Sequence, residues 1–180
     1  SALIKHSDYI IERIGKEQGK KNITETSTFW LGCNSSSILR PYVMLYKLTN
    51  DKKYLDFAAY IVESGGSEIN VFELAYENTL LPYQYGVAKA YEMMSCFEGL
   101  MEYYRLTREE KHLKACLNFA EGVLKNEISI IGCCGCTHEL FDHSSVRQAN
   151  TTNNPIMQET CVTVTLMKFL YRVYLLTGDT

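Results

Sequence analysis

The sequence predicts an all-α protein, an α/α toroid of helical hairpins. Three observations lead to this fold class: a short turn signature occurs three times, the helical pattern before each turn is apolar nearly all round, and the pattern after the first two turns is apolar along one face. A helix that is apolar all round has to be buried, whereas a single apolar stripe indicates a surface helix. Buried and surface helices that alternate in hairpins form two concentric layers, unlike a four-helix bundle.

The turn signature occurs in Tyr46–Leu55, Tyr104–Leu113 and Tyr174–Thr180, and successive copies lie 58 and 70 residues apart. In each copy a helical pattern ends at Leu-Thr, and an acidic residue stands where the next helix would begin. Each copy therefore predicts the tight turn of a helical hairpin.

The helices follow in order. A surface helix is predicted over Ala2–Lys16, and buried inner helices over 36–48, 87–106 and 156–176. Outer helices follow the first two turns and carry their apolar stripes at 55–62 and 113–124. Pro41 predicts that the first inner helix begins near residue 40 or bends there. Cys161–Thr165 alternates like a strand, but the apolar pattern around it extends over about 20 residues and favours a helix.

The connections from outer to inner helices are long, over Ser64–Gln84 and Glu127–Pro155. Both would lie at the N-termini of the inner helices, and long loops in a compact domain are often functional. The third hairpin has its inner helix and turn but no outer helix. We therefore expect residues 1–180 to be a partial domain truncated after Thr180, about half of a six-hairpin ring. Its uncovered inner helices would favour self-association.

Composition narrows the function classes. Of the 180 residues 46% are hydrophobic and 22% charged, and the net charge is −3, which is typical of a globular chain with one core. The acidic balance and the lack of a Lys/Arg run disfavour nucleic-acid binding. No stretch reaches the roughly 18–20 apolar residues of a membrane span. The chain shows no signal peptide, which leaves bacterial periplasm or cytoplasm open. Seven scattered cysteines predict a largely reduced protein, with Cys96 and Cys116 in the core.

The second long connection contains the densest set of reactive side chains. It combines three thiols, two imidazoles and carboxylates: Cys133, Cys134, Cys136, His138, Glu139, Asp142 and His143. A polar surface loop with incidental thiols is one interpretation, and a metal or reactive-thiol site is the other. A zinc knuckle built from this loop alone would lack the two separated ligand pairs that such knuckles use.

Glu159 and Cys161 open the third inner helix. A helix N-terminus favours the anionic forms of a carboxylate and a thiol, and these forms bind metals. Alternatively, Glu159 only complements the helix dipole, and the sequence physics leaves both interpretations open. Glu139 is similarly either a general acid/base or a solvated loop acid.

The chain resembles glycoside hydrolase family 127, the β-L-arabinofuranosidases with an (α/α)6 toroid. The resemblance rests on Gly135–Asp142 (Gly-Cys-Thr-His-Glu-Leu-Phe-Asp), Met157–Cys161 (Met-Gln-Glu-Thr-Cys) and the last Leu-Thr-Gly-Asp turn. It implies that Glu159 and Cys161 are two ligands of an active-site zinc. Glu139 matches the family's general acid/base, although His-Glu-Leu-Phe stands here in place of Gly-Glu-Ala-Phe.

The resemblance also implies retaining hydrolysis, in which a zinc-bound thiolate attacks the anomeric carbon while Glu139 protonates the leaving oxygen. The family's vicinal cysteine pair that supplies this thiolate follows the Glu-Thr-Cys motif. Cys133–Cys134 precedes the motif, so the role is not transferred to it. The expected function is a fragment of a retaining, β-L-arabinofuranosidase-like hydrolase of plant-type glycans, with an incomplete zinc site and no activity on its own.

Two other functions remain open at this point. The first is a non-catalytic helical-repeat module that binds carbohydrate or protein, although the 58- and 70-residue spacings differ from the 34-residue period of tetratricopeptide arrays. The second is a toroid enzyme of other chemistry, such as a sugar epimerase or an unsaturated glucuronyl hydrolase, which would not need Glu-Thr-Cys. Thirteen tyrosines and Trp30 would suit sugar-facing walls, but most of these aromatic residues are expected in the core.

Overall fold

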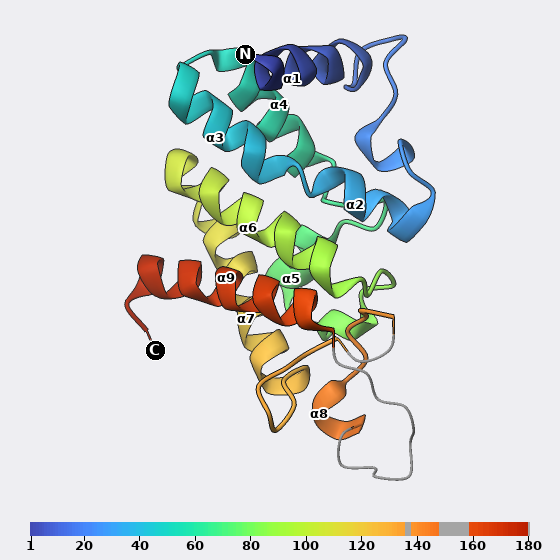
Figure 1. Ribbon diagram of the computed structural model, residues 1–180, viewed down its shortest axis with the longest axis vertical. Coiled ribbons are helices and arrows are strands. Elements are labelled where there is room, and N and C mark those ends of the chain that lie inside the picture. The colour runs from blue at the N-terminus through green and yellow to red at the C-terminus, as the bar shows by residue number, and fades with distance from the viewer. Residues whose placement is uncertain (136–137, 148–158, 180) are drawn as a thin grey trace.

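The computed structural model describes residues 1–135, 138–147 and 159–179 (Figure 1). These residues form helices and connections, and no strand occurs among them apart from two isolated bridges, Ile14 with Lys21 and Lys89 with Leu140. The all-α prediction is confirmed. No helix in the described part of the chain is both long and apolar enough to cross a membrane.

The inner layer consists of three helices that lie side by side: α3 (Leu39–Thr49), α6 (Ala90–Thr107) and α9 (Thr160–Thr177) (Figure 1). Helix α6 packs against α3 on one side and against α9 on the other. Helices α3 and α6 each begin three residues later than the sequence predicted. The first difference arises because residues 33–36 form a separate short helix, α2 (Cys33–Ser36). The second arises because the backbone of residues 88–90 is paired with residues 139–141 where α6 begins.

The outer layer consists of α1 (Ala2–Arg13), α4 (Lys52–Glu63), α5 (Val71–Glu77) and α7 (Glu110–Asn126). Helix α4 packs on α3, and α7 packs on both α5 and α6. Two sequence predictions need correction. Helix α1 ends before Lys16, because Ile14 is extended and bridges to Lys21. The connection at 64–84 is not an open loop, because it contains α5 and the 3₁₀ turn η3 (Pro82–Gln84), elements too short to show a periodic pattern.

The repeated turn signature is a helix C-cap. Each inner helix ends on a residue in the left-handed conformation whose N–H donates to the carbonyl of the signature tyrosine four residues earlier. The three pairs are Asn50 with Tyr46, Arg108 with Tyr104, and Gly178 with Tyr174. The same local hydrogen bond thus occurs at all three turn signatures, and the first two lead directly into the outer helices α4 and α7.

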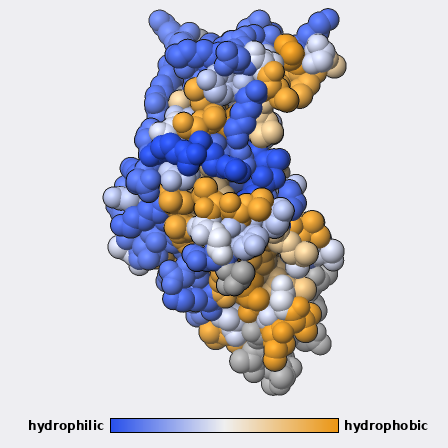
Figure 2. Space-filling model, turned by 90° about the vertical axis from the view of Figure 1, so that its left-hand side faces the viewer, coloured by the Kyte–Doolittle hydropathy of each residue, from blue (hydrophilic) through white to orange (hydrophobic). Residues whose placement is uncertain are grey.

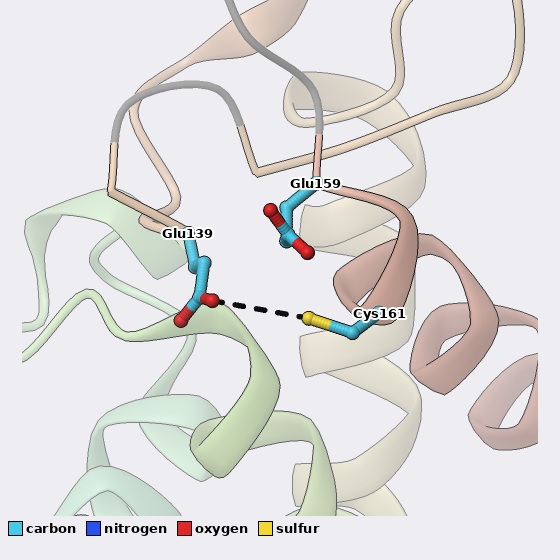
Figure 3. A group of neighbouring side chains, drawn as sticks. All are labelled: Glu139, Glu159 and Cys161. Atoms are coloured by element: carbon cyan, nitrogen blue, oxygen red, sulfur yellow. Dashed lines mark hydrogen bonds between the residues drawn. The ribbon is translucent and has the colours of Figure 1, made fainter.

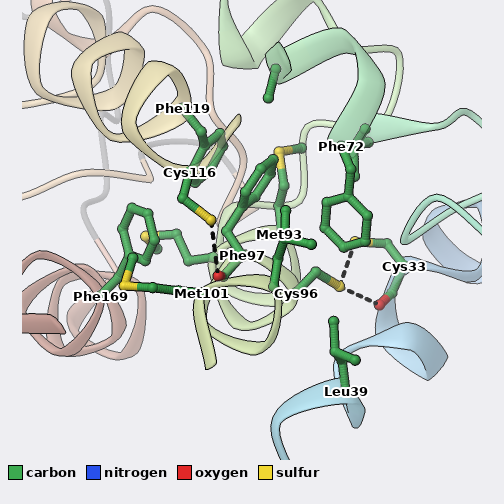
Figure 4. Close-up of a cluster of buried hydrophobic side chains, with 14 of the residues drawn as sticks. Cys33, Leu39, Phe72, Met93, Cys96, Phe97, Met101, Cys116, Phe119 and Phe169 are labelled. Atoms are coloured by element: carbon green, nitrogen blue, oxygen red, sulfur yellow. Dashed lines mark hydrogen bonds between the residues drawn. The ribbon is translucent and has the colours of Figure 1, made fainter. Parts of the chain in front are cut away.

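The core between the layers is aromatic and sulfur-rich (Figure 4). The rings of Phe97 on α6 and Phe119 on α7 stack with centroids 3.9 Å apart. Cys96 and Cys116 are fully buried beside them, as the sequence predicted. Gly99 allows α6 to approach α3, because a Cβ there would lie 2.7 Å from the side chain of Leu39.

The prediction that inner helices are buried on all sides holds for α6 but not for α9. Helix α9 packs on α6 and α7 through one face only. Its other face is exposed and largely apolar, with Val164, Met167, Tyr171, Tyr174 and Leu175. Figure 2 shows how apolar surface lies between hydrophilic residues on one side of the molecule. In the described part of the chain, no further helix covers this outer face of α9.

Candidate functional site

The loop that carries Glu139 is hydrogen-bonded through its backbone to the N-terminus of α6. The N–H of Ala90 donates to the carbonyl of Glu139 at 2.9 Å, and the N–H of Phe141 donates to the carbonyl of Ala88 at 2.7 Å. This short antiparallel pairing fixes the backbone on both sides of Leu140. The second long connection therefore meets the inner layer at its N-terminal end, where the sequence predicted the chemistry.

Glu139 and His138 adopt an unusual backbone conformation. Their φ angles are +60° and +52°, in the left-handed region that side-chain-bearing residues rarely enter. Such a conformation costs on the order of 1 kcal/mol per residue. The hydrogen bonds to α6 hold the loop in this shape, and the shape directs the Glu139 carboxylate toward the start of α9 (Figure 3).

Glu159 is the N-cap residue of α9, with an extended backbone at φ −78° and ψ 123°. Its side chain accepts no capping hydrogen bond from its own helix, so the carboxylate remains available to other groups. The N–H of Glu159 donates to the carbonyl of Gly135 at 3.2 Å. Gly135 has a φ of +78°, and a Cβ there would meet Val162 at 2.8 Å. A glycine is thus required for the loop to pass over α9.

Glu139, Glu159 and Cys161 converge. One carboxylate oxygen from each glutamate and the Cys161 sulfur all lie within 4.8 Å of one another. The Cys161 thiol is exposed and points at Oε1 of Glu139 over 3.9 Å (Figure 3). Within residues 1–135, 138–147 and 159–179, no other three His, Cys, Asp or Glu side chains form such a group.

The donor set fits zinc. Two carboxylate oxygens and a thiolate sulfur are all ligand types that zinc accepts, with bonds of roughly 2.0–2.3 Å. In a tetrahedral site with bonds of that length, the donor atoms lie about 3.5 Å apart. Side-chain rotations that move the three donor atoms by about an ångström would bring them to this spacing. The softer sulfur donor favours zinc over magnesium or calcium, which prefer oxygen alone.

The electrostatics of Cys161 differ from the sequence prediction. Partial burial raises the pKa of the Cys161 thiol, and the hydrogen bond with Glu159 and the charges of Glu159 and Glu139 raise it further. The N–H of Val162 at the helix N-terminus lowers the pKa but is outweighed. A helix N-terminus is therefore not enough to favour the thiolate beside two glutamates.

Residues 1–180 match the family described as "Beta-L-arabinofuranosidase, GH127 catalytic domain". The chain belongs to glycoside hydrolase family 127. No curated protein matches the chain significantly.

Two solved GH127 structures share the fold. A GH127 β-arabinofuranosidase superposes with a TM-score of 0.67 at 22% identity, covering 98% of this chain and 26% of its own. A GH127 β-L-arabinofuranosidase from Geobacillus stearothermophilus T6 gives a TM-score of 0.63 at 19% identity, covering 98% and 29%. The chain thus spans about a quarter of the length of these enzymes. The helices of this chain correspond to part of the α/α toroid of these enzymes, as the sequence predicted.

Other candidates from the sequence lie outside the three-residue group. Asp142 forms an ion pair with Arg147, and His143 stacks on Tyr83 with ring centroids 4.8 Å apart. Cys133 and Cys134 are not part of the group either, and Cys136 lies outside the described residues. The vicinal thiols and the imidazole of His143 therefore do not belong to the group that Glu139, Glu159 and Cys161 form.

Two further charged residues of the GH127 chain interact electrostatically with Glu139. Lys89, the N-cap residue of α6, forms an ion pair with Glu139. Glu92 lies in the first turn of α6, and burial raises its pKa; the charge of Glu139 adds to the shift and that of Lys89 opposes it. Sequence reasoning missed both residues. The available signal was their position at the start of a buried helix, the same position that singled out Glu159 and Cys161.

Proposed function

We propose that this chain is part of a retaining glycoside hydrolase of the β-L-arabinofuranosidase type that acts on plant-type glycans. The observation that supports the proposal is that Glu139, from a loop, lies close to Glu159 and Cys161 at the start of α9, up to 22 residues later in the sequence. Membership of GH127 supports a glycan substrate.

Glu159 and Cys161 would hold the zinc ion. When bound, zinc supplies positive charge that stabilises thiolates, including a thiolate nucleophile. Glu139 protonates the leaving glycosidic oxygen and then removes a proton from the incoming water, as the acid/base residue of a retaining enzyme does. The backbone hydrogen bonds at Ala90 and Phe141 support this role, because a fixed backbone holds the carboxyl in one orientation.

A pocket lined by Leu140, the residue that follows Glu139, would suit a sugar. It has a volume of about 350 Å³ and is lined by Trp30, Leu31, Val87 and Leu140, among others. Trp30 belongs to the 3₁₀ segment η2 (Phe29–Gly32), where both Trp30 and Leu31 have positive φ angles. Its indole is partly exposed, and exposed aromatic faces pack well on the apolar faces of sugar rings. This arrangement supports Trp30 as one wall of the substrate site.

The test is arabinofuranoside hydrolysis by a protein that contains this chain within a GH127 domain. We expect Glu139→Gln to lower turnover by about 10²- to 10⁴-fold, the usual contribution of a general acid/base, while metal analysis shows zinc retained. Glu121→Gln is the matched control, because Glu121 is an exposed glutamate on α7. Residues 1–180 alone should be inactive. Full activity of Glu139→Gln, or turnover by the isolated chain, would contradict the proposal.

A further inference from the structure

Lys89 is a buried lysine at the candidate metal site. Only 8% of the residue is exposed. Its ammonium group forms an ion pair with Oε2 of Glu139 and donates to the carbonyl of His138 at 3.2 Å. It also lies over the ring of Trp30, 4.9 Å from the centroid. The ammonium group thus has two hydrogen-bond acceptors and one aromatic face around it.

The position of Lys89 is set by the backbone. Residues 88–90 pair with 139–141, and Lys89 itself bridges to Leu140. The pairing therefore keeps the backbone of Lys89 beside the backbone that carries Glu139. A buried ammonium group also has to keep its partners, because an unpaired buried charge is strongly destabilising.

The contacts of Glu139 divide its carboxylate between two sides. Oε2 faces Lys89, and Oε1 faces the sulfur of Cys161 at 3.9 Å. Glu139 is thus near enough to serve as a third ligand beside Glu159 and Cys161. A carboxyl group that transfers protons has to stay off the metal, because coordination occupies the oxygen that would carry the proton.

We propose that Lys89 is the positioning residue that keeps Glu139 off the metal. The proposal rests on the metal site and the acid/base role proposed above. By holding Oε2, Lys89 separates the carboxylate that handles protons from the carboxylate and thiolate that bind the cation. Without Lys89, Glu139 turns toward Glu159 and Cys161 and becomes a ligand.

A simpler role for Lys89 makes a different prediction. A lysine that only repels the incoming cation would weaken metal binding to the same extent whether or not Glu139 carries a carboxylate. A positioning lysine acts through Glu139, so its effect disappears when Glu139 is replaced. A double-mutant cycle on metal affinity separates the two roles.

The experiment titrates the chain with zinc by calorimetry and with cobalt(II) by visible absorption, which reports the number of ligands. The variants are Lys89→Met, Glu139→Gln and the double variant, with Lys89→Arg to keep the charge. Lys125→Met is the control, because Lys125 is an exposed lysine on α7 paired with Glu121. Lys89→Gln, which retains a donor for the His138 carbonyl, replaces Lys89→Met if circular dichroism shows that Lys89→Met is unfolded.

We expect Lys89→Met to bind zinc about 10- to 100-fold more tightly, with a changed cobalt spectrum, as for the gain of one ligand. In the Glu139→Gln background the same change should have no such effect, and Lys89→Arg should behave as the unmodified chain. An equal gain in both backgrounds, or no gain in either, would overturn the role of Lys89. If Cys161→Ser leaves zinc binding unchanged, the metal site itself is wrong, and that outcome is distinct from a failure of Lys89 alone.

Discussion

Glu127 is a fully buried carboxyl group that organises the loop behind the candidate site. It accepts hydrogen bonds from the backbone N–H groups of Asp142, His143 and Ser144, at 3.0 to 3.3 Å. Burial raises the pKa of Glu127 to about 7, and the three N–H groups oppose that shift. The side chain thus holds the end of α7 against residues 142–144, which follow Glu139 in the loop.

The raised pKa of Glu127 predicts a pH dependence of stability. Its pKa in the unfolded chain is near 4.5, so between about pH 4.5 and 7 the folded chain binds more protons than the unfolded chain. The stabilisation is complete below pH 4.5 and is lost as the pH rises through 7. At about 1.4 kcal/mol per pKa unit, the loss amounts to about 3 kcal/mol.

Urea unfolding at pH 5 and pH 8 tests this prediction. The free energy of unfolding should fall between the two pH values in the unmodified chain, and Glu127→Gln should remove most of that fall. An identical pH dependence in the two proteins would show that Glu127 is not the group responsible.

At the level of single residues, the sequence predicted the members of the site but not their partners. Glu139, Glu159 and Cys161 were singled out because the motif around them resembles GH127, whereas charge and helix position alone left their roles open. The contacts of Lys89 and Glu127 depend on loops that fold back onto helix ends about 50 and 15 residues away in sequence. No local pattern encodes such pairs.

At the level of elements, ion pairs join the three inner helices. Glu98 and Glu102 on α6 are almost completely buried. Glu102 pairs with Lys47 on α3 at 2.6 Å and with Arg172 on α9 at 3.3 Å. Glu98 pairs with cations on the same two helices: Arg40 on α3, and Lys168 and Arg172 on α9. Two acidic residues of one helix thus pair with basic residues of both neighbours.

Glu102→Gln should destabilise the chain by about 3 kcal/mol at neutral pH. This is the lower end of the cost of breaking a buried ion pair, because Lys47 and Arg172 still reach solvent. Burial alone would raise the pKa of Glu102, but the hydrogen bond from Lys47 and the charges of Lys47, Arg105 and Arg172 lower it overall. The stabilisation is therefore present above the ordinary pKa and is lost as the pH falls through the lowered one.

Chemical denaturation of Glu102→Gln and Asp56→Asn compares this pair with an exposed one. Asp56 pairs with Lys52 at 3.0 Å on the surface of α4, and such pairs contribute less than about 1 kcal/mol. Equal losses in the two variants would contradict the special position of Glu102.

Helix order, hairpin turns and layers were predictable because they follow from periodicity and from one recurring C-cap. The boundaries were less predictable. The apolar pattern predicted a helix from residue 87, but the backbone of residues 88–90 is paired with residues 139–141. Helix α5 is only seven residues long, too short to show a periodic pattern. Its N-cap Asn70 and its buried Val71 and Phe72 become recognisable only once α7 packs over them.

At the level of the whole molecule, the exposed apolar face of α9 predicts self-association. Contiguous apolar surface of this kind is unusual on a soluble monomer. Sedimentation velocity should show concentration-dependent association of the chain, and Met167→Lys on this face should reduce it. Leu48→Lys on α3 is the control, because Leu48 is also exposed but lies on another helix. A chain that stays monomeric at high concentration would contradict the prediction.

We propose that Glu159 and Cys161 bind zinc beside Glu139, and a zinc titration of the chain and three variants would test this site. We predict one weakly bound zinc per chain, because catalytic zinc sites use about three protein ligands and Glu139 is held by Lys89. Cys161→Ser and Glu159→Gln should each weaken binding at least about tenfold. Cys133→Ser should bind as the unmodified chain does. Loss of zinc in Cys133→Ser, with zinc binding by Cys161→Ser unchanged, would instead place the metal in the loop around Cys133.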